Sequence, residues 1–133
     1  MDHTYKVQIL EHHLDSFGHV NNAVYMQLFE QARWELITER GFGSDVIMQL
    51  KQGPVLLDAR IQYRKELRNR EWITIESEIK PTDKKLLFAI HQEMIKEDGK
   101  IAAVADFTGG LMDLQQRKLI EPTTKWEAVL SSD

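Results

Sequence analysis

The residues best suited to chemistry lie in one short turn, Asp15-Ser16-Phe17-Gly18-His19-Val20-Asn21-Asn22. The turn places one carboxylate, that of Asp15, a few residues before the expected start of a helix. The first turn of a helix carries backbone N–H groups without partners and a partial positive charge. A carboxylate beside such donors can attack or hydrate a carbonyl, because the N–H groups stabilise the charge that develops on its oxygen. This chemical interpretation makes Asp15 the reactive group and the N–H of Asn21 or Asn22 the oxyanion donor.

The same residues also suit an ordinary connection between a strand and a helix. Asp, Ser, Gly and Asn are the types that turns favour, and Gly18 lets the backbone turn tightly or approach a ligand. Composition alone favours this structural interpretation. The chemical interpretation stays open beside it.

A long amphipathic helix is predicted after the turn. Asn21 or Asn22 suits its N-cap, and Gly41 suits its C-terminal end. Between them, apolar residues recur at spacings of three and four, as in a helix that buries one face. They are Val24, Tyr25, Leu28, Phe29, Ala32, Leu36 and Ile37. About nineteen residues at ~1.5 Å each give a length of about 28 Å, which is long for a small domain.

The rest of the chain shows the period of two that is typical of half-buried strands. Strands are predicted at residues 5–9, 57–64, 73–80, 86–95 and 101–112. Residues 42–53 are expected to connect the helix to the sheet, and a short helix is expected after Pro122. This order predicts the α+β class, an antiparallel sheet of about five strands with one long helix on one face. Residues 1–133 are expected to form a single domain.

The strand at 101–112 bears on packing and assembly. Gly109-Gly110 indicates a bulge or a close approach of two backbones. Because one helix covers only one face of a sheet, the other face and the edge strands must be covered or paired. The long, regular strand at 101–112 is the candidate for pairing with a second copy, so a homo-oligomer is expected.

Composition excludes several classes of protein. The chain has 133 residues, 42% hydrophobic and 29% charged, as expected of a globular domain. A formal net charge of −4 argues against nucleic-acid binding, and the absence of cysteine excludes disulfides, thiolate metal sites and a cysteine nucleophile. His12, His13 and His91 show no metal-ligand spacing, so no metal is expected. No membrane-spanning run or signal-peptide core is present, so a cytoplasmic protein is expected.

Residues 13–33 resemble a family motif. The run His13-Leu14-Asp15-Ser16-Phe17-Gly18-His19-Val20-Asn21-Asn22-Ala23-Val24-Tyr25, continued by Phe29-Glu30-Gln31-Ala32-Arg33, is similar to the hotdog-fold acyl-CoA thioesterases of the 4-hydroxybenzoyl-CoA thioesterase type. That family shows the pattern D-x-x-G-H-V-N-N-x-x-Y-x-x-x-x-E-x-A-R at the start of its central helix. Every fixed position is filled, by Asp15, Gly18, His19, Val20, Asn21, Asn22, Tyr25, Glu30, Ala32 and Arg33. The resemblance covers most of the chain and implies the hotdog fold, a sheet wrapped around one long central helix.

The resemblance also implies roles for individual residues. Asp15 matches the catalytic carboxylate, acting as nucleophile or general base, and the backbone N–H near Asn22 matches the donor that polarises the thioester carbonyl. Family members form dimers or tetramers with acyl-CoA between subunits, and the reaction needs no metal or organic cofactor. The sequence departs from many members at His13, where they carry a second acid. The pattern makes His19 a scaffold residue of the turn rather than a catalytic base.

Glu30 and Arg33 are three residues apart on the expected helix. They suit a helix-surface ion pair, a buried structural pair or a contact between subunits. Tyr25 and Phe29 are expected in the core rather than at a ligand.

Positive charge gathers at and after the strand at 57–64. Five of the seventeen lysine and arginine residues fall within eleven positions, namely Arg60, Arg64, Lys65, Arg68 and Arg70. Arginine binds phosphates well, such as those of the CoA nucleotide; the alternative is a solvated strand end. Arg64 and Arg68 are the candidate phosphate ligands. Gly18 and Asn21 are the candidate substrate-binding residues of the turn.

The sequence thus predicts hydrolysis of an acyl-CoA thioester, or of an acyl carrier protein thioester, to a free acid and a thiol. One alternative is a hotdog-fold hydratase or dehydratase of enoyl thioesters. Such enzymes generally pair an acidic residue with a histidine, and Asp15 and His19 superficially supply both. The other alternative is an acyl-binding module without catalysis.

Overall fold

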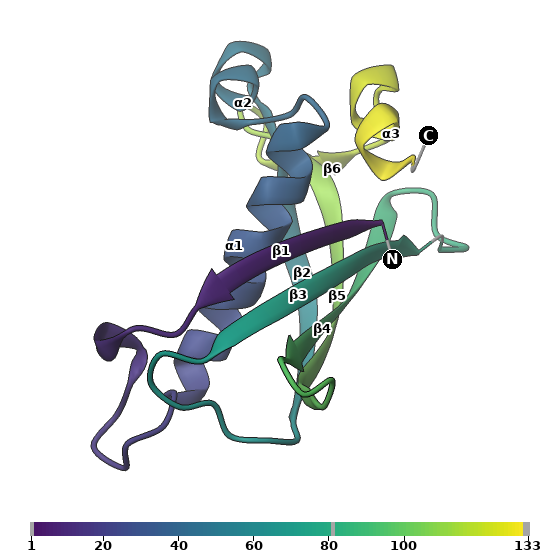
Figure 1. Cartoon of the computed structure of the whole chain (residues 1–133). Coiled ribbons are helices and arrows are strands. Elements are labelled where there is room, and N and C mark those ends of the chain that lie inside the picture. Colours follow the sequence, from purple (N-terminus) through teal and green to yellow (C-terminus); the bar gives the residue numbers. More distant parts are fainter. Residues whose placement is uncertain (1, 81, 132–133) are drawn as a thin grey trace.

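The computed structural model describes residues 2–80 and 82–131, and in this part of the chain one long helix lies across an antiparallel sheet (Figure 1). Within those residues the sheet has six strands: β1 (His3–Gln8), β2 (Gln52–Tyr63), β3 (Trp72–Lys80), β4 (Leu87–Lys96), β5 (Ile101–Asp113) and β6 (Lys118–Ile120). Their order is β1-β3-β4-β5-β2, and β6 pairs with the last residues of β5. The predicted class and antiparallel sheet are confirmed, and β6 is a short addition that the sequence pattern did not predict.

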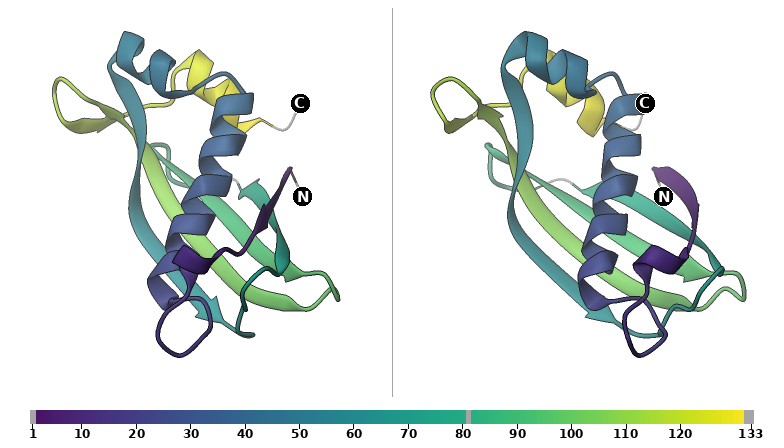
Figure 2. Two further views of the ribbon diagram at one scale, coloured as in Figure 1. Left: turned by 60° about the vertical axis from the view of Figure 1, so that its left-hand side comes forward. Right: turned by 90° about the vertical axis from the view of Figure 1, so that its left-hand side faces the viewer.

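The central helix, α1 (Asn22–Glu39), forms where the spacing of apolar residues predicts it. Its buried residues are Val24, Tyr25, Leu28, Phe29, Ala32, Arg33, Leu36 and Ile37. All seven predicted apolar positions are among them, and Arg33 is added. Leu28 and Phe29 are fully buried, and each such side chain stabilises the fold by about 1.5–3 kcal/mol. Figure 2 shows α1 lying along the concave face of the sheet.

The two ends of α1 are built differently. Asn21 precedes the helix in extended backbone, at φ −62° and ψ 140°, but its side chain makes no capping hydrogen bond. At the other end Gly41 adopts a φ of 92°, which only glycine adopts without strain. Its N–H then donates to the carbonyl of Thr38, and the N–H of Phe42 to that of Ile37, both at 3.0 Å. The C-terminal end is therefore closed, whereas the first turn has no side-chain cap.

Two short helices, α2 (Ser44–Leu50) and α3 (Thr124–Leu130), lie at the end of the molecule away from the turn (Figure 2). The prediction for residues 42–53 is wrong in detail, because this segment forms α2 and the start of β2. The predicted C-terminal helix is confirmed as α3, where the hydroxyl of Thr123 accepts the N–H of Trp126 at 3.3 Å. None of the described helices is long and apolar enough to span a membrane.

The prediction that residues 101–112 pair with a second copy is wrong, because β5 lies inside the sheet. It pairs with β4 on one side and β2 on the other. Residues 102–105 are all buried, and a strand covered on both faces belongs in the interior of a sheet. In the described chain the long edge strand is β2, which exposes Leu56, Leu57 and Tyr63.

The backbones of β2 and β5 approach closely at Gly109. A Cβ atom there would lie 2.5 Å from the carbonyl oxygen of Val55 and 2.8 Å from Cζ of Phe88. The predicted close approach is thus confirmed. The irregularity lies opposite, in β2, where the register shifts between Leu56 and Asp58.

The core has two parts, one toward each end of α1. Near its start, Phe29 meets Phe107 edge to face with ring centroids 6.0 Å apart, and Val20 of the turn is buried in the same cluster. Near its end, Phe88 meets Trp126 at 5.4 Å. Burial of Val20 fixes the turn to the first part of the core.

Candidate active site

The turn before α1 is closed by its own hydrogen bonds. The N–H of Asp15 donates to the carbonyl of His19 at 3.0 Å, and the N–H of Gly18 donates to the carbonyl of Asp15 at 3.2 Å. Gly18 has a φ of 86°, where a side chain would be strained. The carboxylate of Asp15 accepts the N–H of Phe17 on Oδ1 at 2.8 Å, as in an Asx turn. The main chain of the turn therefore holds Asp15 in one orientation.

Two contacts join the turn region to the segment between β2 and β3. The N–H of Val20 donates to the carbonyl of Leu67 at 2.9 Å. Just before the turn, Glu11 forms a two-bond contact with the guanidinium of Arg70, at 2.6 and 2.7 Å. Hydrogen bonds from Arg70 lower the pKa of Glu11 to about 2, so the pair stays ionised at neutral pH.

The first N–H groups of α1 differ in availability. The N–H of Asn21 donates to the carbonyl of His13 at 3.1 Å, and the N–H of Val24 donates to the carbonyl of Asn21 at 2.9 Å. Among the described residues, nothing accepts the N–H of Asn22. The hydroxyl of Tyr63 donates to the carbonyl of Asn22 at 3.1 Å, which ties the helix start to the end of β2. Of the two predicted oxyanion donors, Asn22 is the one whose N–H is open.

A groove of about 470 Å³ opens beside the turn. It is lined by Asp15, Phe17, His19 and Val20 of the turn, Asn22 and Tyr25 of α1, and residues 63–66. Three of the predicted site residues, Asp15, Asn22 and Arg64, share this lining. The fold thus brings the carboxylate, the open helix start and one arginine to a single surface.

The other three candidates lie outside the lining of this groove. Gly18 shapes the turn, and the N–H of Asn21 is taken by the main chain. Arg68 is exposed, its guanidinium pairs with the carboxylate of Glu66, and its N–H donates to Glu71 at 2.6 Å. The groove therefore favours Arg64 over Arg68 as a phosphate ligand.

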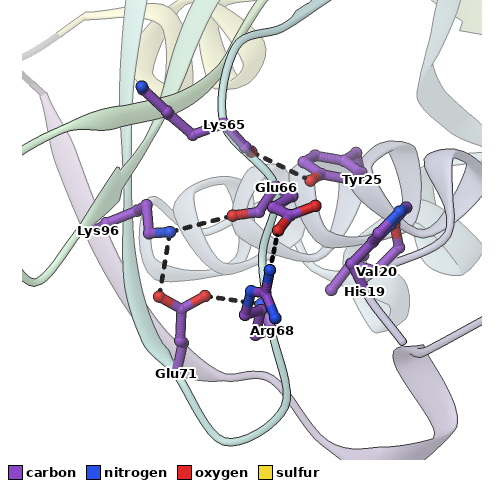
Figure 3. A network of polar contacts seen from close by, with 8 residues as sticks. All are labelled: His19, Val20, Tyr25, Lys65, Glu66, Arg68, Glu71 and Lys96. Atoms are coloured by element: carbon purple, nitrogen blue, oxygen red, sulfur yellow. Dashed lines mark hydrogen bonds and ion pairs between the residues drawn. The ribbon is translucent and has the colours of Figure 1, made fainter. Parts of the chain in front are cut away.

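Tyr63 and Glu66 belong to the groove although sequence reasoning missed them. The ring of Tyr63 meets that of Tyr25 edge-on, with centroids 5.0 Å apart and an angle of 90°. Tyr25 is buried as expected, and burial raises the pKa of its hydroxyl, which stays protonated. That hydroxyl makes a long contact of 3.4 Å with the carbonyl of Lys65 (Figure 3). The alternation of apolar and polar residues in β2 indicates that Tyr63 faces the helix. It does not indicate that a groove lies at this end of the strand.

Lys96 holds the wall of the groove that follows β2 (Figure 3). Its Nζ donates to the carbonyl of Glu66 at 3.0 Å and pairs with the carboxylate of Glu71 at 3.2 Å. Glu71 also accepts the N–H of Arg68. In Figure 3 the side chain of Lys65 points away from this network, so its charge is not used to hold the wall.

His19 contributes its main chain to the turn and its ring to the groove. Its carbonyl accepts the N–H of Asp15, as expected of a scaffold residue. Its Nδ1 lies 3.4 Å from the carbonyl of Val20. The ring lies 6.0 Å from that of Phe17, whose 81% exposure makes it an apolar rim of the groove.

His13, where the sequence departs from the family pattern, supports the segment before the turn. Its Nδ1 accepts the N–H of Leu10 at 2.8 Å, so this nitrogen carries no proton. Burial lowers the pKa of His13 below its usual 6.5, and the charge of His12 acts in the same direction. The neutral imidazole is therefore the form that the fold uses.

The lowered pKa of His13 predicts a pH dependence of stability. The unfolded chain takes up a proton near pH 6.5, whereas the folded chain does so only at lower pH. Stability from this group is thus complete above pH 6.5 and falls as the pH drops below it. His13→Asn keeps an acceptor near the position of Nδ1 and does not titrate. We expect urea unfolding to show the wild type losing stability relative to this variant between about pH 7 and about pH 5; parallel pH responses would contradict this role.

In the described chain Glu30 and Arg33 form no ion pair, so neither the helix-surface pair nor the buried pair is present, and the contact between subunits stays a prediction. Arg33 is 7% exposed, its Nη1 donates to Gln92 at 3.2 Å, and its guanidinium carbon lies 4.2 Å from the centroid of the Phe107 ring. Burial lowers the pKa of Arg33 to about 10, against the opposing charge of Glu30. Both residues line a second cavity, of about 230 Å³, which also contacts β2.

The fold and the turn together define a class of protein. Residues 9–130 match the Thioesterase-like superfamily, and the chain belongs to this family. A hypothetical protein from Aquifex aeolicus has a TM-score of 0.89 at 22% identity, over 97% of this chain and 99% of that one. A hypothetical protein from Staphylococcus aureus, solved in complex with CoA, has a TM-score of 0.89 at 16% identity, over 96% of this chain and 80% of that one. The predicted hotdog fold is confirmed.

One relative is similar in sequence across most of both chains. It is the long-chain acyl-CoA thioesterase FadM of Escherichia coli strain K12, 25% identical over 115 residues, which are 86% of this chain and 86% of that protein. The resemblance to acyl-CoA thioesterases that the turn indicated is thereby confirmed.

Proposed function

We propose that this protein hydrolyses acyl-CoA thioesters, with Asp15 as nucleophile or general base and the N–H of Asn22 as oxyanion donor. The observation that carries the proposal is the shared groove, to which Asp15 and the open start of α1 both contribute. A relative named as a long-chain acyl-CoA thioesterase and a similar fold solved in complex with CoA support it.

The contacts of Asp15 suit either role. The N–H of Phe17 occupies Oδ1, and in the described chain Oδ2 accepts no hydrogen bond. As nucleophile, Oδ2 attacks the thioester carbon, CoA leaves as the thiolate, and water then cleaves the mixed anhydride. As general base, it takes a proton from the water that attacks. In both routes the carbonyl oxygen becomes negative beside the N–H of Asn22, and one such donor contributes about 3 kcal/mol to the transition state.

Positive charge at the edge of the groove suits the phosphates of CoA. Arg64 and Lys65 line the groove, whereas Arg68 is paired with Glu66. The same charges suit the phosphopantetheine of an acyl carrier protein, so the assay includes both carriers.

A second copy of the chain would complete the site. β2 has a free edge beside the groove, and antiparallel pairing about a two-fold axis sets the start of one β2 beside the end of the other. Tyr63, at the end of β2, lines the groove, while Pro54 and Leu56, near its start, line the cavity of about 230 Å³. A homodimer of this kind brings the groove of one subunit to the cavity of its partner, so that acyl-CoA lies between them.

Leu57→Lys tests this dimer. Leu57 is 52% exposed and lies at the bulge in the middle of β2, where a charge opposes pairing of two edges. We expect the variant to sediment as a monomer at micromolar concentrations at which the wild type is a dimer, and to lose most thioesterase activity. Met48→Lys, at an exposed residue of α2, is the control and should leave both unchanged. A monomeric wild type, or a dimeric and active Leu57→Lys, would contradict the shared site.

The direct test of function is thiol release from a panel of short, long and aromatic acyl-CoAs and from an acyl carrier protein thioester. Release by the wild-type protein supports the proposal. Because His19 shares the groove with Asp15, the panel includes an enoyl-CoA, and hydration without thiol release would favour a hydratase instead. Binding of acyl-CoA without either reaction would favour an acyl-binding module.

A further inference from the structure

Two cavities at one end of the sheet share a single residue. The first, of about 230 Å³ between α1 and β2, has a mostly apolar lining that includes Trp34, Ile37, Leu56 and Phe88. It is called the acyl cavity because the proposed homodimer would bring it to the groove of the partner subunit. An end cavity of about 350 Å³ lies beside the β3–β4 connection and α3, with apolar residues Ile79, Leu87 and Leu130 among its lining. Phe88 is the residue of the described chain that lines both.

The ring of Phe88 is held in place by its neighbours. The side chain is 5% exposed, and its ring meets that of Trp126 edge to face at 5.4 Å and 62°. On another side it lies against the backbone of Gly109, where an added Cβ would come within 2.8 Å of Cζ. The position of this ring is therefore determined by the residues packed around it rather than by the preferences of its own side-chain torsions.

We propose that Phe88 sets the upper limit on acyl-chain length by closing the inner end of the acyl cavity. The inference rests on the proposed thioesterase function and names the substrate class of that site, an unbranched acyl group of short to medium length. A cavity of about 150 Å³ holds benzene, so a volume of about 230 Å³ holds roughly nine carbon atoms. Longer chains leave carbon atoms in water unless the ring moves.

Truncation of Phe88 joins the two cavities and extends this limit. Each methylene group that leaves water is worth about fourfold in binding, so a few extra methylenes give about tenfold or more. Phe88→Ala opens the passage fully, and Phe88→Leu opens it with less loss of packing. The matched control is Phe42→Leu, because Phe42 is fully buried in the same cluster and contacts Trp126 at 5.1 Å but lines neither cavity.

The experiment measures Kd for S-alkyl-CoA thioethers, which cannot be hydrolysed, with chains of about six to about sixteen carbons. For the wild type and Phe42→Leu we expect affinity to rise with length and to level off near roughly nine carbons. For both Phe88 variants the affinity should keep rising with chain length. The longest ligand should then bind to the variants at least about tenfold more tightly than it binds to the wild type, while the shortest ligand should bind to both equally.

Either of two results overturns the inference. One is a wild type whose affinity keeps rising to the longest chain, and the other is a Phe88 variant with the wild-type length profile. Thiol release is measured separately with the matching acyl-CoAs. If no thiol is released but the binding profile is as expected, the thioesterase function is rejected and the length limit is kept. If thiol is released but the Phe88 variants bind with the wild-type length profile, the thioesterase function is kept and the length limit is rejected.

Discussion

Replacement of Asp15 by asparagine is expected to lower kcat for thioester hydrolysis by about 10³-fold, within the range of a lost general base. The amide has the shape of the carboxylate, and its oxygen can still accept the N–H of Phe17, which lies 2.8 Å from Oδ1. The turn is thus preserved, and the change is confined to charge. An amide neither attacks a thioester carbon nor takes a proton from water. Steady-state thiol release, with thermal unfolding as a check on the fold, measures the effect.

The chain offers a matched control in a second Asx turn. Oδ1 of Asp98 accepts the N–H of Lys100 at 2.9 Å in the β4–β5 hairpin, outside the groove. Asp98→Asn therefore makes the same chemical change in the same local geometry and should leave kcat unchanged. Asp15→Ala should match Asp15→Asn in activity and lose about 1 kcal/mol more stability, because it also removes the contact with Phe17. An Asp15→Asn variant with wild-type turnover would reject the catalytic assignment.

One part of the candidate site is continuous in the chain and could be predicted from the sequence. Residues 15–22 follow local rules: an aspartate that accepts a nearby N–H, a left-handed glycine and a helix start. The apolar spacing of α1 is likewise a local pattern, and its buried face matched the prediction at every apolar position. Such features need no knowledge of distant contacts.

The rest of the site depends on residues that meet only in the folded chain. Tyr63 reaches the carbonyl of Asn22 from 41 residues away, and Lys96 holds the carbonyl of Glu66 from 30 residues away. No local period records these contacts. The preference for Arg64 over Arg68 also depended on a tertiary fact, the position of the groove relative to the two side chains.

The fold was mispredicted where the local pattern is ambiguous. Residues 102–105 are small, apolar and all buried, so they show no alternation that separates an edge strand from an interior one. Residues 44–50 form α2, a helix of seven residues in which Val46 and Ile47 pack against the core but are only partly buried, so the apolar pattern is too short to separate a helix from a connecting segment. In both cases the deciding interactions come from neighbouring elements.

Gly109→Ala is expected to lower the free energy of unfolding by about 3 kcal/mol, at the upper end of ordinary overpacking in a core. The new Cβ would lie 2.5 Å from the carbonyl oxygen of Val55. Because that oxygen belongs to the backbone of β2, no side-chain rotation relieves the contact, and the two strands must move apart. For a domain of this size the midpoint of thermal unfolding should fall by roughly 10 °C.

Gly53→Ala is the control, since its Cβ would meet Cγ2 of Ile47 at 3.2 Å, a side-chain atom that can move aside; it should cost less than about 1 kcal/mol. A Gly109→Ala variant as stable as this control would show that the strands are not in rigid contact.

The double variant with Phe88→Leu separates the two contacts at Gly109 by a thermodynamic cycle. Removing the ring relieves the approach of 2.8 Å but leaves Val55 in place, so we expect only partial recovery. Complete recovery would mean that the ring of Phe88, rather than the backbone of β2, is what requires glycine at this position.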